Sequence, residues 1–271
     1  MKIGFPIWYG YGDKLTRMIS EAASVGFSYV EISLDYPWPF RGRYALEEVI
    51  DKALDVGLSI AFHAPWRDIR LASPIEEVRE ASVKAFKRFL DEISKHPCDY
   101  VVVHLSSDQA IDRIPEIRNE YVNSAVKSIK EIKSLGDLLG LRIVFENVRE
   151  DVATFKQIIS KADSEVCLDI SHAICLAARN SKKNRLDEEV KAWIGELKDR
   201  IRVIHFSGLK FIGNWVKDHI LVRKDDRYLK LVKSELENLR VENFLLEVFE
   251  DPDRGEVYPS QLREVVEFLK R

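Results

Sequence analysis

Residues 99–105 read Asp-Tyr-Val-Val-Val-His-Leu, a short apolar run that ends in a histidine. Three consecutive valines favour an extended strand, and a run without polar alternation is typical of a strand buried on both faces. Seven further runs of this type begin near Lys2, Ser28, Ser59, Arg142, Glu165, Ile201 and Glu242. The chain therefore contains eight candidate strands at regular intervals.

A segment with helical spacing of apolar residues follows each candidate strand. In one of them, apolar residues recur at spacings of three and four, at Val83, Phe86, Phe89, Leu90 and Ile93. The pattern predicts helices over residues 13–24, 46–56, 75–95, 117–139, 152–162, 187–197, 228–239 and 259–270. Eight strand–helix units in 271 residues are the layout of a single (β/α)8 TIM barrel, an α/β fold. We expect residues 1–271 to form one domain.

Histidines and carboxylates stand at the ends of the apolar runs, where each would be costly to bury alone. The set comprises His63, His104, Glu146, Asp169, His172, His205, His219 and Glu247. Parallel strands bring their carboxyl ends to one face of a barrel, so these side chains are expected to converge. A doubly wound open sheet would feed its site from two or three strands only. Imidazole and carboxylate together form the ligand mixture of a zinc, manganese or iron site.

The composition excludes several classes of protein. The net charge is 42 − 45 = −3, which gives no support to bulk binding of nucleic acid. No apolar run approaches the roughly 20 residues that a membrane-spanning helix needs, so no membrane partner is expected. The three cysteines are odd in number and lack the paired spacing of a metal site. They are interpreted as reduced thiols, and the protein is predicted to be cytoplasmic.

Three long irregular stretches, 35–43, 63–74 and 207–226, follow candidate strands and would lie on the active face of a barrel. They carry the aromatic residues Trp38, Phe40, Trp66, Phe211 and Trp215. Each aromatic alone is best interpreted as a loop residue packed under the rim. Together with the cations of the same stretches, the aromatics could form a substrate platform over the metal site. These cations are Arg41, Arg43, Arg67, Arg70, Lys210, Lys217 and Arg223. The residues expected to contact substrate are Trp66, Lys210, Lys217 and Asp218.

Several stretches resemble the xylose isomerase-like TIM barrels and, within them, the endonuclease IV family (AP endonuclease family 2). The resemblance is densest at 63–65 (His-Ala-Pro), 69–74 (Ile-Arg-Leu-Ala-Ser-Pro) and 76–82 (Glu-Glu-Val-Arg-Glu-Ala-Ser). Cys167-Leu-Asp169 with Ser171-His-Ala173 is also similar, as are the shorter Phe145-Glu146-Asn147 and Leu246-Glu247. The opening Trp8-Tyr-Gly-Tyr-Gly12 and the segment 205–210, which lacks an Asn-Asp pair, depart from the family pattern.

The resemblance implies a phosphodiesterase that uses two or three zinc ions to cut DNA beside abasic sites, with Glu146 and Glu247 as catalytic residues. By position, it implies two metal sites that share one carboxylate. The first set is His63, His104 and Glu146, and the second is Glu146, Asp169, His205 and Glu247.

A third zinc would need His172, His219 and an aspartate two residues before His219. Lys217 occupies that position, and Asp218 stands directly beside His219. A zinc ion next to a lysine would be repelled by a few kcal/mol even at an effective dielectric near 20. The third site is therefore expected to be empty or weakly filled unless Asp218 turns inwards.

Sugar isomerases and epimerases of the same superfamily imply an alternative. They hold one metal, manganese or cobalt, with a set that matches Glu146, Asp169, His205 and Glu247, and the two glutamates move protons on a small sugar or sugar phosphate. This alternative leaves the pair His63 and His104 unexplained. Glu31, inside the second candidate strand, is interpreted as a buried structural pair or as a partner behind His63.

Overall fold

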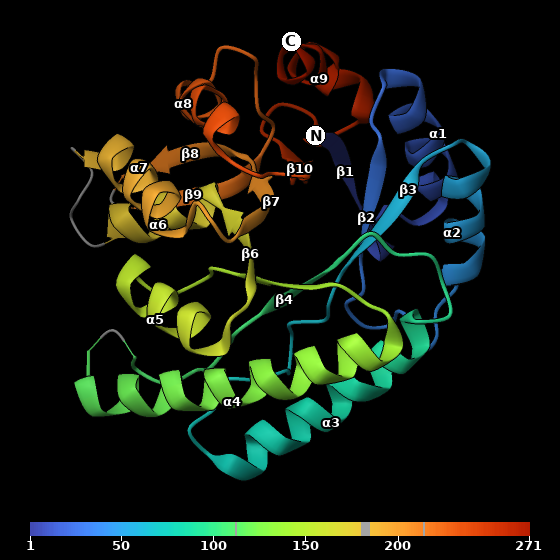
Figure 1. Ribbon diagram of the computed structural model, residues 1–271. Coiled ribbons are helices and arrows are strands. Elements are labelled where there is room, and N and C mark those ends of the chain that lie inside the picture. The colour runs from blue at the N-terminus through green and yellow to red at the C-terminus, as the bar shows by residue number, and fades with distance from the viewer. Residues whose placement is uncertain (112, 180–184, 214) are drawn as a thin grey trace.

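The computed structural model describes residues 1–111, 113–179, 185–213 and 215–271. Within these ranges, eight parallel strands close into a barrel in the order β1-β10-β7-β6-β5-β4-β3-β2 (Figure 1). The strands are β1 Lys2–Trp8, β2 Tyr29–Ser33, β3 Ser59–His63, β4 Val101–His104, β5 Ile143–Glu146, β6 Glu165–Asp169, β7 Ile201–Phe206 and β10 Asn243–Leu246. The predicted TIM barrel is confirmed, and a doubly wound open sheet is excluded.

Helices surround the barrel, with α3 and α4 side by side on one flank (Figure 1). The helices are α1 Leu15–Val25, α2 Leu46–Asp55, α3 Glu76–Ile93, α4 Pro115–Leu139, α5 Val152–Ala162, α6 Ile170–Arg179, α7 Leu186–Leu197, α8 Arg227–Glu235 and α9 Arg263–Lys270, with short 3-10 turns at Tyr9–Lys14, Leu236–Asn238 and Pro259–Leu262. Each helix predicted from spacing overlaps one of these. None of the described helices is long and apolar enough to cross a membrane.

The α6 helix was not predicted. It begins at Ile170, directly after β6 ends at Asp169, so no turn residue separates strand from helix. The apolar character continues across the junction, which hides the change of period. The Asp169 carboxylate accepts a hydrogen bond from the backbone N–H of His172 at 2.6 Å and satisfies one free donor of the first helical turn.

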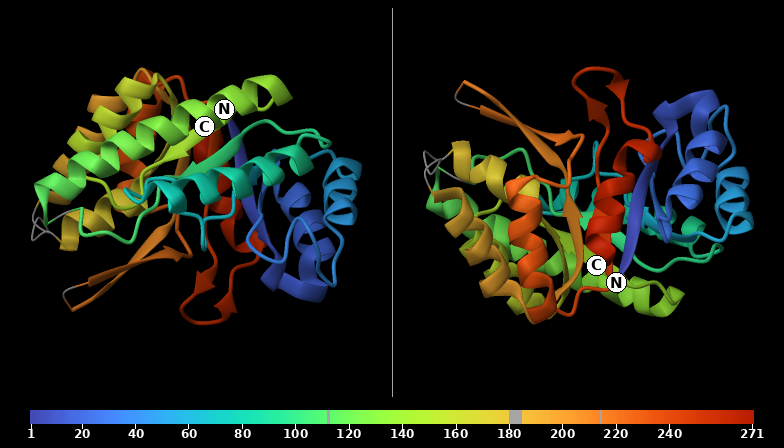
Figure 2. Two further views of the ribbon diagram at one scale, coloured as in Figure 1. Left: turned by 90° about the horizontal axis from the view of Figure 1, so that it is seen from below. Right: turned by 90° about the horizontal axis from the view of Figure 1, so that it is seen from above.

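The stretch 207–226 was expected to be irregular, and this expectation is wrong. It contains the antiparallel strands β8 Gly208–Ile212 and β9 Trp215–Ile220, which join β11 Glu250–Asp251 and β12 Gly255–Glu256 in a small second sheet. Figure 2 shows both hairpins projecting from one side of the molecule, away from the two termini. Because β8 and β9 are partly exposed and polar residues interrupt them, they lack the apolar run that marks the barrel strands.

The barrel interior has its own core, separate from the core between strands and helices. Its members are fully buried and come from seven strands: Tyr29, Ala61, Tyr100, Val102, Val144, Cys167, Val203 and Leu245. Gly4 of β1 lies against this layer, where a Cβ atom would come within 2.2 Å of the Tyr29 ring. The glycine therefore makes room for Tyr29.

We predict that Gly4→Ala destabilises the protein by about 1–3 kcal/mol, because Tyr29 has no free volume to move into. Gly195, exposed in α7 with nothing within 4 Å of an added Cβ, is the matched control. Gly195→Ala should stabilise by about 0.5–1 kcal/mol through helix propensity. Urea unfolding of both variants measures this, and equal midpoints would contradict the close packing at Gly4.

Candidate metal centre

The polar residues predicted from strand ends form the next layer above the interior core. Side chains two positions apart on a strand face the same way, so each polar residue follows a core residue by two. The pairs are Tyr29 and Glu31, Ala61 and His63, Val102 and His104, Val144 and Glu146, Cys167 and Asp169, Val203 and His205, and Leu245 and Glu247. The alternation of the barrel therefore places a ring of imidazoles and carboxylates at the carboxyl end of the interior core.

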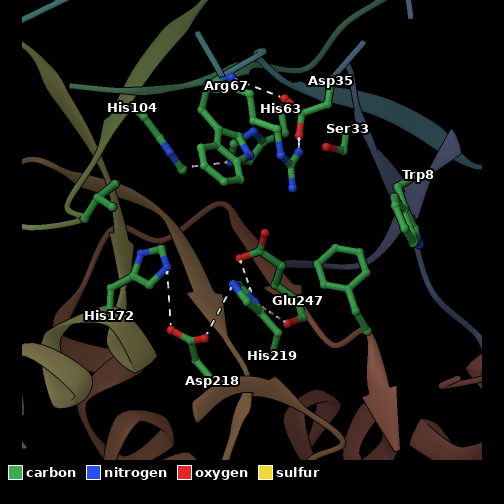
Figure 3. Close-up of a pocket in the computed structure, with 13 residues that line it drawn as sticks. Trp8, Ser33, Asp35, His63, Arg67, His104, His172, Asp218, His219 and Glu247 are labelled. Carbon is green, nitrogen blue, oxygen red and sulfur yellow. Dashed lines mark hydrogen bonds and ion pairs between the residues drawn. The ribbon is translucent and has the colours of Figure 1, made fainter. Parts of the chain in front are cut away.

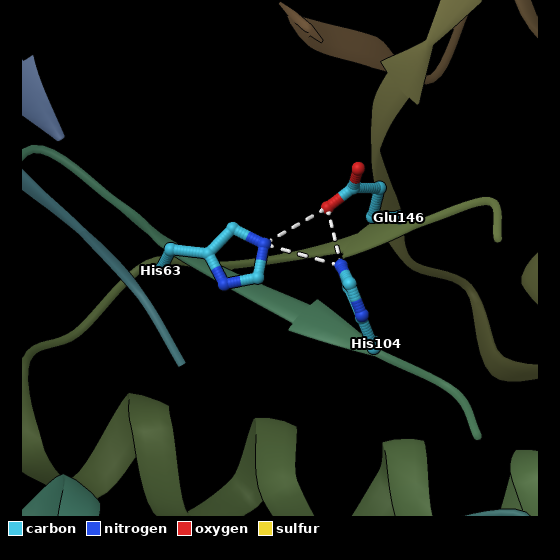
Figure 4. Close-up of side chains that lie close together, drawn as sticks. All are labelled: His63, His104 and Glu146. Atoms are coloured by element: carbon cyan, nitrogen blue, oxygen red, sulfur yellow. Dashed lines mark hydrogen bonds and ion pairs between the residues drawn. The ribbon is translucent and has the colours of Figure 1, made fainter. Parts of the chain in front are cut away.

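The first cluster joins His63, His104 and Glu146 (Figure 4). The Nε2 atoms of the two histidines are 3.1 Å apart, and Glu146 Oε2 lies 3.3 Å from His63 Nε2 and 2.9 Å from His104 Nε2. His63 Nδ1 lies 3.0 Å from the carbonyl oxygen of Ala64. A carbonyl only accepts, so Nδ1 carries a proton and Nε2 is the nitrogen that faces the cluster.

The second cluster joins Glu146, Asp169, His205 and Glu247, all of them buried. Four of its atoms have no hydrogen-bond partner within the described residues, namely Glu146 Oε1, Asp169 Oδ2, His205 Nδ1 and Glu247 Oε2. His205 Nδ1 lies 3.2 Å from Glu247 Oε2 and 3.5 Å from Glu146 Oε1 without hydrogen-bond geometry. Unpaired buried polar atoms are costly, and a shared divalent cation would satisfy all four together.

The third cluster joins His172 of α6 with Asp218 and His219 of β9. Asp218 Oδ2 lies 3.9 Å from His172 Nε2, and Asp218 Oδ1 lies 3.9 Å from His219 Nε2. His219 has a φ of 56°, which interrupts the strand alternation and lets two adjacent residues face the same cavity. Lys217 points elsewhere and forms an ion pair with Glu250. Asp218 therefore turns inwards, the condition under which a third site was expected.

A cavity of about 370 Å³ opens above these clusters (Figure 3). Its lining includes Trp66 and Asp218, as expected for substrate contacts, whereas Lys210 and Lys217 do not belong to it. Lys210 is exposed on β8, so the structure does not support a contact between either lysine and a substrate in this cavity. Trp38 of the expected platform is buried, and its indole N–H donates to the Tyr44 carbonyl.

Other lining residues were missed by the sequence reasoning. They are Trp8, Ser33, Asp35, Val148 and Phe249, whereas Arg67, a cation of the expected platform, does line the cavity. Asp35 forms an ion pair with Arg67, whose guanidinium lies 4.2 Å from the centre of the Trp66 ring. Asp35 and Arg67 lie in the irregular stretches 35–43 and 63–74. The sequence indicated only that these stretches follow strands and so lie near the site. Their pairing across two loops required the folded chain.

Burial and mutual charge shift the pKa values of the cluster residues. Burial opposes protonation of His63, but the hydrogen bond and charge of Glu146 outweigh it and raise the pKa of His63 to about 9. The charges of Asp169 and Glu146 likewise overcome burial and raise the pKa of His172 to about 9. Burial raises the pKa of Asp169 to about 7. The histidine charges overcome burial and lower the pKa of Glu247 to about 2.

Comparison with known proteins identifies relatives of two kinds. A family model described as xylose isomerase-like TIM barrel matches residues 19–271. A protein named probable endonuclease 4 from Aquifex aeolicus (strain VF5) is 24% identical over 213 residues, covering 72% of this chain and 73% of that protein.

Two solved structures resemble the whole barrel. D-psicose 3-epimerase from Clostridium cellulolyticum H10, solved with D-tagatose, has a TM-score of 0.66 at 16% identity and covers 97% of this chain and 90% of that one. Endonuclease IV from Thermus thermophilus has a TM-score of 0.58 at 19% identity and covers 100% of this chain and 99% of that one. At these identities the likeness concerns the fold.

We predict that the metal-free protein loses stability as pH rises from about 6.5 to 9. The raised pKa values of His63 and His172 stabilise the fold below about 6.5, and this contribution is lost as pH rises through about 9. Asp169, whose pKa is raised to about 7, ionises at a growing cost in the same direction. Tm in the presence of a chelator should fall by roughly 5 °C or more over this range.

Saturating zinc should reduce this fall, because bound imidazoles are already deprotonated. The variant His96→Gln, which changes a histidine outside the clusters, should keep the same slope. A Tm that stays level or rises between pH 6.5 and 9 without metal would contradict the protonated histidines.

Proposed function

This chain belongs to the xylose isomerase-like TIM barrel family, and from that premise we propose that it is a divalent-metal-dependent phosphodiesterase that cuts DNA at abasic sites. The observation that carries the proposal is the assembly of three adjoining clusters. A one-metal isomerase would use only Glu146, Asp169, His205 and Glu247. The pair of histidines in the first cluster and the inward-facing Asp218 in the third are not ligands of that single metal, and in a one-metal enzyme the two histidines would instead hydrogen-bond a substrate oxygen.

The ring tautomers support the metal sites. His172 Nδ1 donates to the carbonyl of Asn147 at 3.0 Å, and His219 Nδ1 donates to the carbonyl of Glu247 at 3.2 Å. Each ring therefore leaves Nε2, the nitrogen that faces Asp218, as the atom that would bind a metal. Metal-binding histidines characteristically donate their second ring N–H to an oxygen in this way. Zinc is the ion that suits this mixture of imidazole and carboxylate.

Glu146 links the first two clusters through its two oxygens. Oε2 faces His63 and His104, whereas Oε1 faces His205. Metal ions bound on both sides would polarise a phosphoryl oxygen and lower the pKa of a bound water. The protein's own part is to hold the two positions at a fixed separation through Glu146 and to exclude bulk water by burial. Glu247, at the cavity edge, is placed to accept a proton from the attacking water.

We predict that Glu146→Gln lowers cleavage of an abasic-site duplex by at least ~100-fold and reduces bound metal by more than one ion per chain. His63→Ala should remove at most one metal, because only the first cluster contains His63. Elemental analysis of dialysed protein and a duplex-cleavage assay measure both effects, and circular dichroism controls for folding. Full activity and metal content in Glu146→Gln would show that this residue does not bridge two ions.

For the third cluster we predict opposite results for two neighbouring substitutions. Asp218→Asn should remove one metal per chain, because it deletes the carboxylate that joins His172 and His219 in the third cluster. Lys217→Met should leave the metal content unchanged, because Lys217 pairs with Glu250 and lies outside the cavity. If Lys217→Met raised the metal content, the lysine would be the group that repels the third ion.

A second function, epimerisation or isomerisation of a small sugar or sugar phosphate, is favoured by the charges at the mouth. Several cations around the cavity are paired with carboxylates, in Arg67–Asp35, Arg70–Asp108 and Lys217–Glu250. Binding of duplex DNA draws its affinity from cations that replace counterions on phosphates, and paired cations contribute less. The cavity of about 370 Å³ also suits a small ligand, with Glu146 and Glu247 as its acid and base.

One comparison separates the two functions. The wild-type protein is loaded with zinc, manganese or cobalt and assayed on an abasic-site duplex and on a panel of ketoses. Cleavage with two or three zinc ions bound supports the phosphodiesterase. Ketose conversion with one manganese or cobalt ion, unchanged in His63→Ala, would replace it with the epimerase.

A further inference from the structure

Glu31 is a buried carboxylate beneath the metal centre. It lies in β2, faces the barrel interior, and is 2% exposed. Its Oε2 accepts a hydrogen bond from the Tyr100 hydroxyl at 2.7 Å and lies 3.2 Å from His205 Nε2. The sequence indicated Glu31 as a possible partner of His63, but the histidine that Glu31 contacts is His205. A charge in this apolar layer is costly unless it is strongly paired.

The contact determines which nitrogen of His205 carries a proton. A carboxylate accepts, so Nε2 donates to Glu31, and Nδ1 is the nitrogen left to bind a cation once its own proton is released. Nδ1 is the buried atom that has no hydrogen-bond partner and faces Glu146 and Glu247. Glu31 therefore holds the ring in the one tautomer that can bind a cation at the second cluster.

His205 differs from His63, His172 and His219 in the charge of its acceptor. His63, His172 and His219 donate their second ring nitrogen to neutral backbone carbonyls. Hydrogen bonds to an ionised acceptor are about twice as strong as neutral ones. A carboxylate behind an imidazole also makes the opposite nitrogen a better ligand. The contact with Glu31 therefore makes His205 of the second cluster a stronger metal ligand than His63, His172 or His219.

Two tyrosines fix Glu31 in turn. Tyr100 donates to Glu31 and also lies 3.0 Å from the Tyr29 hydroxyl. Tyr29 packs against Gly4 and cannot move. The chain of contacts therefore runs from the interior core through Tyr100 and Glu31 to His205.

We propose that Glu31, held by Tyr100, is a positioning residue that orients His205 and makes the second cluster the tightest metal position of the three. This inference rests on the proposed metal centre, and it assigns a role to a residue that binds neither metal nor substrate. Its consequence is an order of filling: the second cluster binds first, and the sites that rely on backbone carbonyls bind afterwards.

The test is stepwise titration of the metal-free full-length chain with Co²⁺ in competition with a chelator, followed through the cobalt absorption bands. We expect Glu31→Gln, which keeps an acceptor but loses the charge, to weaken the first binding step by about 10-fold, and Glu31→Leu to weaken it by about 100-fold. Tyr100→Phe should have a smaller effect in the same direction. Leucine is apolar and fits the buried layer, so Glu31→Leu should fold. Weaker metal binding in this variant would therefore reflect the lost contact with His205.

Glu150 provides the matched control. It is also 2% exposed and also accepts a hydrogen bond from a tyrosine hydroxyl, that of Tyr121. Its remaining hydrogen bonds come from the backbone N–H groups of Val148 and Arg149. Glu150→Gln should lower Tm and leave the first cobalt step unchanged.

Two results would overturn the inference while the metal centre stands. One is an unchanged first binding step in Glu31→Leu, and the other is an equal weakening in Glu150→Gln. A wild-type protein that binds no Co²⁺ at all would instead overturn the proposed metal centre and remove the basis of the inference.

Discussion

The fully buried carboxylate of Glu146 is the constraint on which the rest of the centre depends. It is 0% exposed and has four imidazoles around it, from His63, His104, His172 and His205. A carboxylate removed from water costs several kcal/mol unless compensating charge stands close by. In the metal-free chain His63, His172 and His205, whose pKa values are raised, supply that charge, whereas burial lowers the pKa of His104. A divalent cation would supply the charge without protons. Removing either Glu146 or the surrounding histidines would therefore leave the remaining buried charge uncompensated and destabilise the barrel mouth.

The alternation of the barrel strands made most of this set predictable. A polar residue two positions after a core residue has to face the same interior, so the polar ends of β3 to β7 and β10 indicate the first two clusters from the amino-acid sequence alone. The eight-unit periodicity similarly indicates the barrel. Alternation predicts that these residues share one layer of the barrel, but it does not predict the distances between their side chains. The 3.1 Å approach of His63 to His104 depends on the register of two neighbouring strands.

The remainder of the centre depends on departures from regular structure. His172 belongs to a helix that follows its strand without a turn, and His219 adopts a left-handed backbone conformation that strand periodicity does not anticipate. Glu31 pairs with a histidine 174 positions away, on a strand that is not its neighbour in the barrel. Local patterns carry no information on such a contact, because it crosses the barrel. Sequence resemblance indicated the third cluster, and only geometry placed Asp218 in it.

Substrate specificity has to come from residues that lie above the proposed metal positions. The four residues Glu146, Asp169, His205 and Glu247 suit hydrolysis and sugar epimerisation equally well, since both need a polarised oxygen and a carboxylate that accepts a proton. Function on this fold is set by the loops after the strands. In this chain those loops place the Asp35–Arg67 pair and the Trp66 ring on the cavity wall. An aromatic face beside a paired cation can stack on a sugar ring or on a nucleotide, but it attracts no long phosphate backbone. If DNA is the substrate, the enzyme must therefore gain its affinity from contacts inside the cavity more than from the flanking duplex.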